Sequence, residues 1–354
     1  MNLNDTARFK ELDPSGMIEH INSLPDQLAA AWQLGNQLEL PAWTGIRSIV
    51  VSGMGGSAIG GDLLAAFGEN SLRVPLVVHR DYGLPAWARG EDTLVICSSH
   101  SGNTEETLSA FEAARAAGCR ILAVATGGAL AEAAKSSGEP LWTFEHKFQP
   151  RTAVGYSFGL LLAAAHRLDL IPDPSAELDG AVAAMKEQQK TLLPEVRDIH
   201  NSSKRMGGQF VGRWITIFGA GLMAPVARRW KTQLNENAKV AAAFEIIPEA
   251  NHNTVQGVVQ PEEEFRATMN IFLRAAHNAP RNELRAEHTR MAIMLQGQNT
   301  DTITALGDSA LANIWTVLHY GDYTSYYLAM AYGLDPTPVP MLAELKEKMK
   351  GEAK

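Results

Sequence analysis

Short runs of apolar residues alternate with longer helical stretches over the first half of the chain. Four of these runs have the length of a strand: SIVVSG (48–53), PLVVH (75–79), TLVICSS (93–99) and RILAVA (120–125). Runs that are apolar throughout are typical of parallel strands covered on both faces. The helical stretches that follow the last two runs end at Gly118 and Gly138, and glycine is a frequent helix-stop signal. We therefore predict a doubly wound α/β domain, preceded by a helical segment over about residues 15–38.

The second half repeats this pattern after a proline-rich break at residues 172–174. RWITIFGAGLMAPVARRWKTQLNENAKV predicts a strand, a turn with Gly219 and Gly221, and a helix. The segment IVVSGMG aligns with ITIFGAG, which is a weak internal repeat. Further elements are expected as follows: an apolar helix from Thr152, a long polar helix at about 176–200, strands in ATMNIFLR and TDTITALG, and helices at about 282–296 and 308–333.

These patterns predict an α/β protein with two tandem doubly wound domains, each a parallel sheet flanked by helices. We expect the first domain, with its leading helical segment, over residues 1–155. The second domain, with C-terminal helices, is expected over residues 156–354.

The composition is that of a globular protein without a nucleic-acid or membrane partner. The chain has 354 residues, 45% hydrophobic and 20% charged, and no run approaches the roughly 18 apolar residues of a membrane span. The N-terminus MNLNDTARFKELD lacks an apolar signal region, and Cys97 and Cys119 have no C-x-x-C spacing. A formal charge of −8 argues against nucleic acid. We expect a cytoplasmic protein.

A glycine-rich turn, GMGGSAIGGD (53–62), follows the first predicted strand and opens a helix. Its first six residues fit the G-x-G-x-x-G/A fingerprint of dinucleotide-binding proteins. In that interpretation Asp81, after the second strand, would contact the ribose 2′-hydroxyl. The alternative is a smaller ligand, for which Gly55 and Gly56 allow close backbone approach and Ser57 adds a donor.

The stretch SSHSGNTEETL (98–108) favours the smaller ligand. Ser99, Ser101 and Thr104 place three hydroxyls beside the unpaired N–H groups at the start of a helix. An ordinary helix cap needs only one hydroxyl. A sugar phosphate would use both loops, with its phosphate on this second one and its sugar beside the first, whereas a dinucleotide leaves the second loop without a role.

These motifs resemble a known family. GMGGSAIGGD, SSHSGNTEETL and PRTAVGYSFG resemble the sugar isomerase (SIS) domain. QLNENAK, PEANHN and GDYTSYYLA with GLDPTPV resemble the bifunctional phosphoglucose/phosphomannose isomerase family. The resemblance covers about residues 15–350. It implies two fused SIS domains, a homodimer, no cofactor and no metal. It also implies interconversion of glucose 6-phosphate, and mannose 6-phosphate, with fructose 6-phosphate through an enediol.

The resemblance assigns roles to individual residues. Glu236 matches the base that moves the proton, and Arg151 matches an arginine that stabilises enediolate charge. His252 matches the residue that opens the sugar ring, reaching the active site of the partner subunit. Thr324 matches a position associated with acceptance of both C2 epimers, although packing between aromatic residues explains a threonine there equally well.

One departure from the family pattern concerns lysine. Relatives can carry an active-site lysine one or two helical turns after the threonine, where this chain has Ala331. The chain has no lysine between Lys239 and Lys346. The contact that such a lysine would make must therefore come from another group, or the substrate differs.

Three alternatives to a hexose 6-phosphate isomerase are open. A non-catalytic sugar-phosphate sensor would keep the hydroxyl loop and have no use for Glu236. An isomerase of a pentose or heptose phosphate would use the same chemistry. A dinucleotide-dependent oxidoreductase would rest on the first glycine-rich turn. The sequence shows no cluster of His, Cys and carboxylate residues with metal-ligand spacing.

Overall fold

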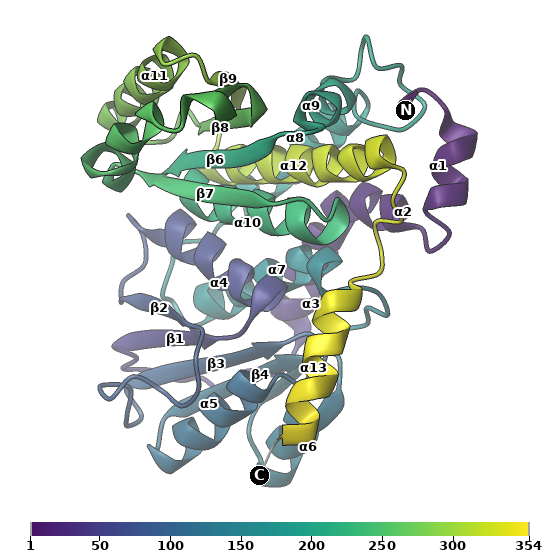
Figure 1. The fold of residues 1–354 in the computed structure, drawn as a ribbon. Helices are drawn as coiled ribbons and strands as arrows, with labels where there is room; N and C mark the ends of the chain where they lie inside the picture. Colours follow the sequence, from purple (N-terminus) through teal and green to yellow (C-terminus); the bar gives the residue numbers. More distant parts are fainter. Residues whose placement is uncertain (1, 353–354) are drawn as a thin grey trace.

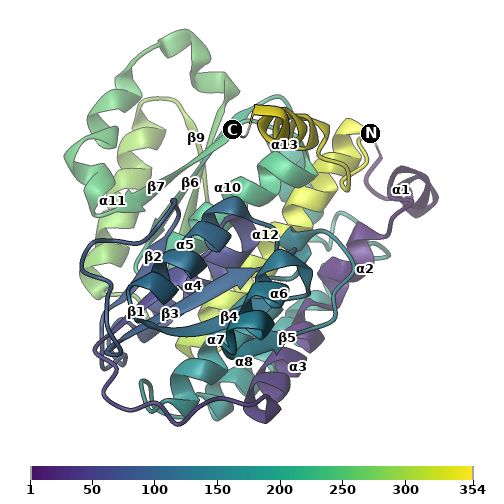
Figure 2. The same cartoon turned by 90° about the horizontal axis from the view of Figure 1, so that it is seen from below.

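Two parallel β-sheets, one in each half of the chain, form the framework of the protein (Figure 1). The computed structural model describes residues 2–352, and the side chains of residues 2–349. All strand pairs in the described part are parallel. Helices flank both sheets (Figure 2), as continuously apolar strands require. The predicted α/β class with two sheets is confirmed.

The first sheet has the strand order β2–β1–β3–β4–β5. Its strands are β1 (Ser48–Ser52), β2 (Leu76–His79), β3 (Thr93–Ser99), β4 (Arg120–Ala125) and β5 (Leu141–Thr143). The first four match the predicted runs, whereas β5 is too short to give an apolar pattern. The strand order reverses between β1 and β3, which lie side by side. In open α/β sheets, ligands bind at the carboxyl ends of the strands at such a switch point.

The second sheet has the strand order β7–β6–β8–β9. Its strands are β6 (Trp214–Ala220), β7 (Ala242–Ile247), β8 (Thr268–Arg274) and β9 (Asn299–Thr304). The predictions for β6, β8 and β9 are confirmed. The sequence pattern misses β7, an edge strand in which only two of six positions are buried.

The helices of the first half are α1 (Thr6–Leu12), α2 (Met17–Asn22), α3 (Leu24–Gln37), α4 (Gly55–Gly68), α5 (Glu105–Ala116), α6 (Gly128–Ser137) and α7 (Val154–Arg167). A short 3-10 helix, η1 (Pro150–Thr152), precedes α7. Helix α7 packs against α3 and α4. Glycines make this packing close, because a Cβ at Gly60 of α4 would lie 2.6 Å from the carbonyl oxygen of Ser157.

The helices of the second half are α8 (Ser175–Gln189), α9 (Ser202–Phe210), α10 (Met223–Asn237), α11 (Pro280–Leu295), α12 (Ala310–Tyr332) and α13 (Pro340–Glu352). Three 3-10 segments follow β7: η2 (Glu249–His252), η3 (Thr254–Val259) and η4 (Glu262–Ala267). The predicted helix at 176–200 is wrong beyond Gln189. Pro194 disfavours the helical conformation at the residue before it, and the chain turns before α9 begins.

Helix α12 is buried along almost its whole length and packs against α8, α9 and α10. Helices α4 and α10 pack against each other and so join the two halves. The expected domain boundary between residues 155 and 156 falls inside α7, and the division of the chain near this point stays a prediction. Over residues 2–352, the structure contains no helix with the length and apolar character of a membrane span.

Candidate active site

The two loops singled out in the sequence meet at the switch point of the first sheet. β1 leads through Met54 into α4, and β3 leads through residues 100–104 into α5. The Ser57 hydroxyl accepts a hydrogen bond from the backbone N–H of His100 at 3.2 Å, which ties the loops together. Gly55 has φ +51°, and a Cβ at Gly56 would lie 2.9 Å from the carbonyl oxygen of Pro150. Only glycine fits this approach of α4 to η1 without displacement.

The hydroxyl loop, which carries Ser99, Ser101 and Thr104, joins the end of β3 to the start of α5. Ser99 Oγ and Thr104 Oγ1 lie 2.8 Å apart. Thr104 is the N-cap residue of α5, yet its hydroxyl makes no capping bond. The exposed Ser101 accepts from the backbone N–H of Asn103 at 3.2 Å. Gly102 has φ +66°, and a Cβ there would lie 1.8 Å from the carbonyl oxygen of Gly127. The Ser99 and Thr104 hydroxyls therefore lie together at the N-terminus of α5, a position that suits a phosphate.

Arg151, in η1, is buried with a side-chain exposure of 3%. Each of its five N–H bonds has a partner. Nε donates to Asn237 Oδ1 at 2.8 Å, and Nη2 donates to the carbonyls of Pro336 and Thr337 at 2.9 and 2.6 Å. Nη1 makes two longer contacts, described below. Burial lowers the pKa of Arg151, and the nearby Glu236 carboxylate opposes this shift. The guanidinium is thus held rigidly in one orientation.

The long contacts of Arg151 point to where a ligand can enter. Nη1 lies 3.3 Å from Gln149 Oε1 and 3.4 Å from Glu236 Oε2. These are weak hydrogen bonds, so a negatively charged oxygen can replace one of them at little cost. The Glu236 side chain is 29% exposed while its arginine partner is buried. The pair therefore presents a carboxylate beside a guanidinium edge, and the backbone of Arg151 packs against Gly56.

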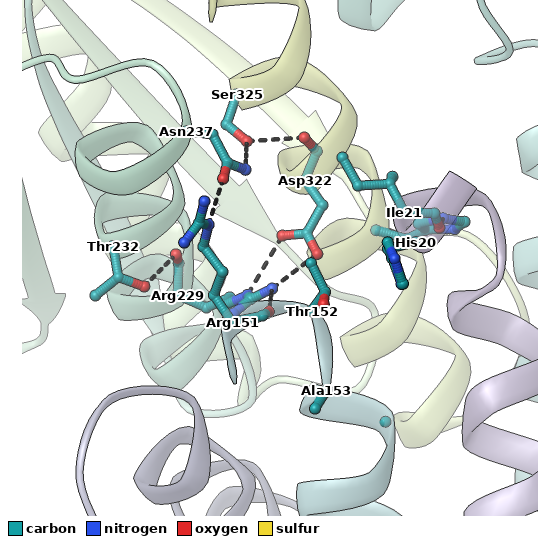
Figure 3. A network of polar contacts seen from close by, with 12 residues as sticks. His20, Ile21, Arg151, Thr152, Ala153, Arg229, Thr232, Asn237, Asp322 and Ser325 are labelled. Atoms are coloured by element: carbon teal, nitrogen blue, oxygen red, sulfur yellow. Dashed lines mark hydrogen bonds and ion pairs between the residues drawn. The ribbon is translucent and has the colours of Figure 1, made fainter. Parts of the chain in front are cut away.

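A buried polar network surrounds Arg151 and joins it to helices α10 and α12 (Figure 3). Asn237 lies between Arg151 and Ser325 of α12, donating to the Ser325 hydroxyl at 3.0 Å. Arg229 of α10 donates to the backbone carbonyl of Arg151 at 2.6 Å and forms an ion pair with Asp322 of α12 at 2.9 Å. The sequence motifs contain Asn237 and Asp322, but nothing in them identifies Arg229 and Asp322 as part of the same cluster.

The hydroxyl of Thr324 does not reach this cluster. Thr324 is fully buried in α12, and its hydroxyl donates to the carbonyl of Tyr320 at 2.9 Å within the helix. Its neighbour Ser325 makes the contact to Asn237. A role of Thr324 in accepting both epimers stays a prediction.

Within one chain, His252 and Glu236 lie at opposite ends of strand β7. Helix α10 runs back from the carboxyl end of β6, so Glu236 lies near the amino end of β7. His252 follows β7 in η2, and a six-residue strand is about 20 Å long. Figure 1 shows the carboxyl ends of β6 and β7 pointing toward α11. Asn251, beside His252, bonds to Thr289 of that helix at 2.5 Å, while His252 itself is exposed.

Three histidines that no motif marks as functional lie beside the hydroxyl loop. His100 Nε2 lies 2.9 Å from His146 Nδ1, and His146 Nε2 lies 3.2 Å from Thr152 Oγ1. His20 stacks on Phe148. Burial lowers the pKa of His146 to about 4 and lowers the pKa values of His20 and His100. The contacts of His100 and His146 link the hydroxyl loop to η1 through Thr152.

Similar proteins cover most of this chain. It is 37% identical over 335 residues to the bifunctional phosphoglucose/phosphomannose isomerase of Caldicellulosiruptor bescii, spanning 94% of this chain and 98% of that protein. The chain belongs to the bifunctional phosphoglucose/phosphomannose isomerase family. The family member from Aquifex aeolicus is 35% identical over 312 residues, 88% of this chain and 92% of the relative. The family described as bacterial phospho-glucose isomerase C-terminal SIS domain matches residues 199–349.

A solved structure supports the fold over the whole chain. A hypothetical protein from Thermus thermophilus matches with a TM-score of 0.74 at 16% identity, covering 99% of this chain and 95% of that one. At this identity the match concerns the fold alone. The resemblance to the family that the motifs carry is thus confirmed by the curated relatives.

The structure gives the residue proposed for a dinucleotide, Asp81, a local role. Asp81 is exposed, and its carboxylate accepts from the backbone N–H of Tyr82 at 2.8 Å. The glycines of the turn instead serve the close approach of α4 to η1. Among residues 2–352, His, Cys, Asp and Glu side chains form no group of three or more that suits a metal ion.

Proposed function

We propose that this protein interconverts glucose 6-phosphate, and also mannose 6-phosphate, with fructose 6-phosphate by moving a proton between C1 and C2. One observation carries the proposal. The backbone of η1, which carries Arg151 and its Glu236 partner, packs against the glycine turn at Gly56, and that turn is bonded through Ser57 to the hydroxyl loop. This arrangement supports a proposed phosphate site on the hydroxyl loop and a proposed acid–base pair on the far side of η1, both serving one phosphorylated sugar.

The phosphate is proposed to bind on the hydroxyl loop. Ser99, Ser101 and Thr104 donate from their side chains, and the first N–H groups of α5 donate from the backbone. The hydrogen bond of 2.8 Å between the Ser99 and Thr104 hydroxyls supports this proposal, because it holds the two groups side by side. Gly55, Gly56 and Ser57 lie beside the sugar.

Glu236 is proposed as the base that takes the proton from one carbon and returns it to the other. Its carboxylate is partly exposed, so substrate can reach it, and it lies 3.4 Å from Arg151 Nη1. When the proton leaves, negative charge develops on the substrate oxygen. Arg151 Nη1 can exchange a long contact for that oxygen, which concentrates the stabilisation in the enediolate and its transition states.

His252 is proposed to open the sugar ring from the partner subunit of a homodimer. His252 is exposed and lies beyond the carboxyl end of β7, so its side chain is available to a second copy of the chain. Co-refolding of Glu236→Gln with His252→Ala tests this arrangement, because a mixed dimer then contains one intact site. Recovery of activity in the mixture, but in neither parent, is expected. An inactive mixture with proven subunit exchange would mean that each site is built from one chain.

A coupled assay tests the function itself. Fructose 6-phosphate formation is followed separately from glucose 6-phosphate and from mannose 6-phosphate, with Glu236→Gln as the matched control. Loss of a general base costs about 10²–10⁴-fold, so kcat should fall by that factor with KM little changed. A wild-type protein that binds these sugars without converting them would be a sensor. Turnover of only a pentose or heptose phosphate would change the substrate class.

A further inference from the structure

Lys239, two residues after the end of α10, has an unusual backbone conformation. Its φ is +56°, in the left-handed region, and the N–H of the next residue, Val240, donates back to the Leu234 carbonyl at 3.3 Å. Glycine is the usual residue at this position of a helix end, because any other residue pays a conformational cost there. A lysine at this position therefore indicates a structural or functional role for its side chain.

The side chain of Lys239 joins two segments that hold Arg151. Its Nζ donates to the carbonyl of Asn237 at 3.0 Å and to the carbonyl of Asp335 at 2.7 Å. The next two carbonyls after Asp335, those of Pro336 and Thr337, accept from Arg151 Nη2. Three consecutive carbonyls thus bind two cations. Without the Lys239 ammonium, the only one of these cations that still binds the carbonyls of residues 335–337 is the Arg151 guanidinium.

We propose that Lys239 is a positioning residue of the isomerase site, which fixes segment 335–337 to the end of α10 and thereby orients Arg151 against Glu236. This inference rests on the proposed function and adds a cation that the family resemblance does not assign. It also fits the absence of any lysine between Lys239 and Lys346, because the cation near the site comes from the helix end of α10 rather than from α12.

The charges around Lys239 indicate that its effect on the position of Arg151 depends on pH. Partial burial and the charge of Arg151 lower the pKa of Lys239 to about 8, against the opposing charges of Asp335 and Glu236. Arg213 and Tyr332 line the same surface hollow from before β6 and from the end of α12. Lys239 is charged below about pH 8 and loses its charge as the pH rises through that value. Its bonds to the two carbonyls then lose their ionic character.

Substitution by glycine separates this role from an ordinary structural one. Lys239→Gly removes both hydrogen bonds, which lowers stability, and relieves the left-handed conformation, which raises it, so the thermal midpoint should change little. If Lys239 orients Arg151, kcat for glucose 6-phosphate should still fall at least tenfold with KM little changed. Asp169→Gly is the matched control, because Asp169 has φ +57° and only an exposed ion pair with Arg73. It should leave kcat unchanged.

The pH profile gives an independent readout. Wild type should lose kcat above about pH 8, whereas Lys239→Arg, which stays charged, should keep its activity there. A Lys239→Gly variant with more than a third of wild-type kcat would overturn the inference. So would an unchanged alkaline decline in Lys239→Arg, or an arginine variant as inactive as the glycine variant. A wild-type protein without isomerase activity would instead refute the proposed function.

Discussion

Replacing Asp322 by alanine removes the partner of an almost completely buried guanidinium. The side chains of Arg229 and Asp322 are 1% and 5% exposed. Asp322 accepts from both Nε and Nη2 of Arg229, at 3.3 and 2.9 Å. After the substitution, the Arg229 guanidinium keeps its bond to the Arg151 carbonyl. The variant therefore contains a buried charge without a counter-ion.

The expected loss follows from that uncompensated charge. Breaking a buried ion pair by removing one partner costs about 3–5 kcal/mol. Because proteins are stable by only about 5–15 kcal/mol, the free energy of unfolding should fall by a large fraction. Activity should fall as well, since Arg229 anchors the backbone of Arg151.

Removing both charges should cost less than removing one. In Arg229→Met with Asp322→Leu, no charge is buried, and apolar replacement of a buried pair is often neutral. The carbonyl of Arg151 still loses its donor, which costs about 1–3 kcal/mol. The double variant should therefore be more stable than Asp322→Ala.

Urea unfolding followed by circular dichroism measures these differences. The expected order of stability is wild type, then the double variant, then Asp322→Ala. A single variant that loses less than about 1 kcal/mol would refute the reasoning, as would a double variant less stable than the single one. Either result would mean that water or another group solvates the Arg229 guanidinium.

Three further outcomes are expected. Replacing Ser99, Ser101 and Thr104 together by alanine should raise KM at least about 100-fold, because each lost hydrogen bond to a charged phosphate is worth about 1.5–3 kcal/mol. Burial lowers the pKa of His319 to about 4, so the unfolded chain binds its proton first and stability should fall as pH decreases from about 6.5 to 4. His319→Gln should weaken that pH dependence in urea titrations. Dialysis against a strong chelator should leave kcat unchanged, and activity that zinc alone restores would contradict the mechanism.

The sequence by itself predicted the features that consecutive residues encode. The strands β1, β3 and β4 are apolar runs, and the turns after β1 and β3 are stretches of about ten residues. Glycines in such a stretch set the conformation of the adjacent backbone, and hydroxyls lie beside the N–H groups of the following helix. Both effects involve neighbouring residues, so they can be read from the sequence. The order of the loops and the class of ligand follow from them. The family relationship, carried by the motifs, added the candidate roles of Glu236 and Arg151.

Only the tertiary structure brought together the partners of Arg151. They come from residues 85 and 186 positions away, and no spacing in a sequence encodes such contacts. The same holds for the ion pair of Arg229 and Asp322 and for the bond between Lys239 and Asp335. The separation of His252 from Glu236 follows from the direction of β7, a strand that the apolar pattern missed. These contacts form only when α10, α12 and η1 pack together, and that packing depends on residues throughout the chain. A strand or a turn, in contrast, is determined mainly by its own consecutive residues.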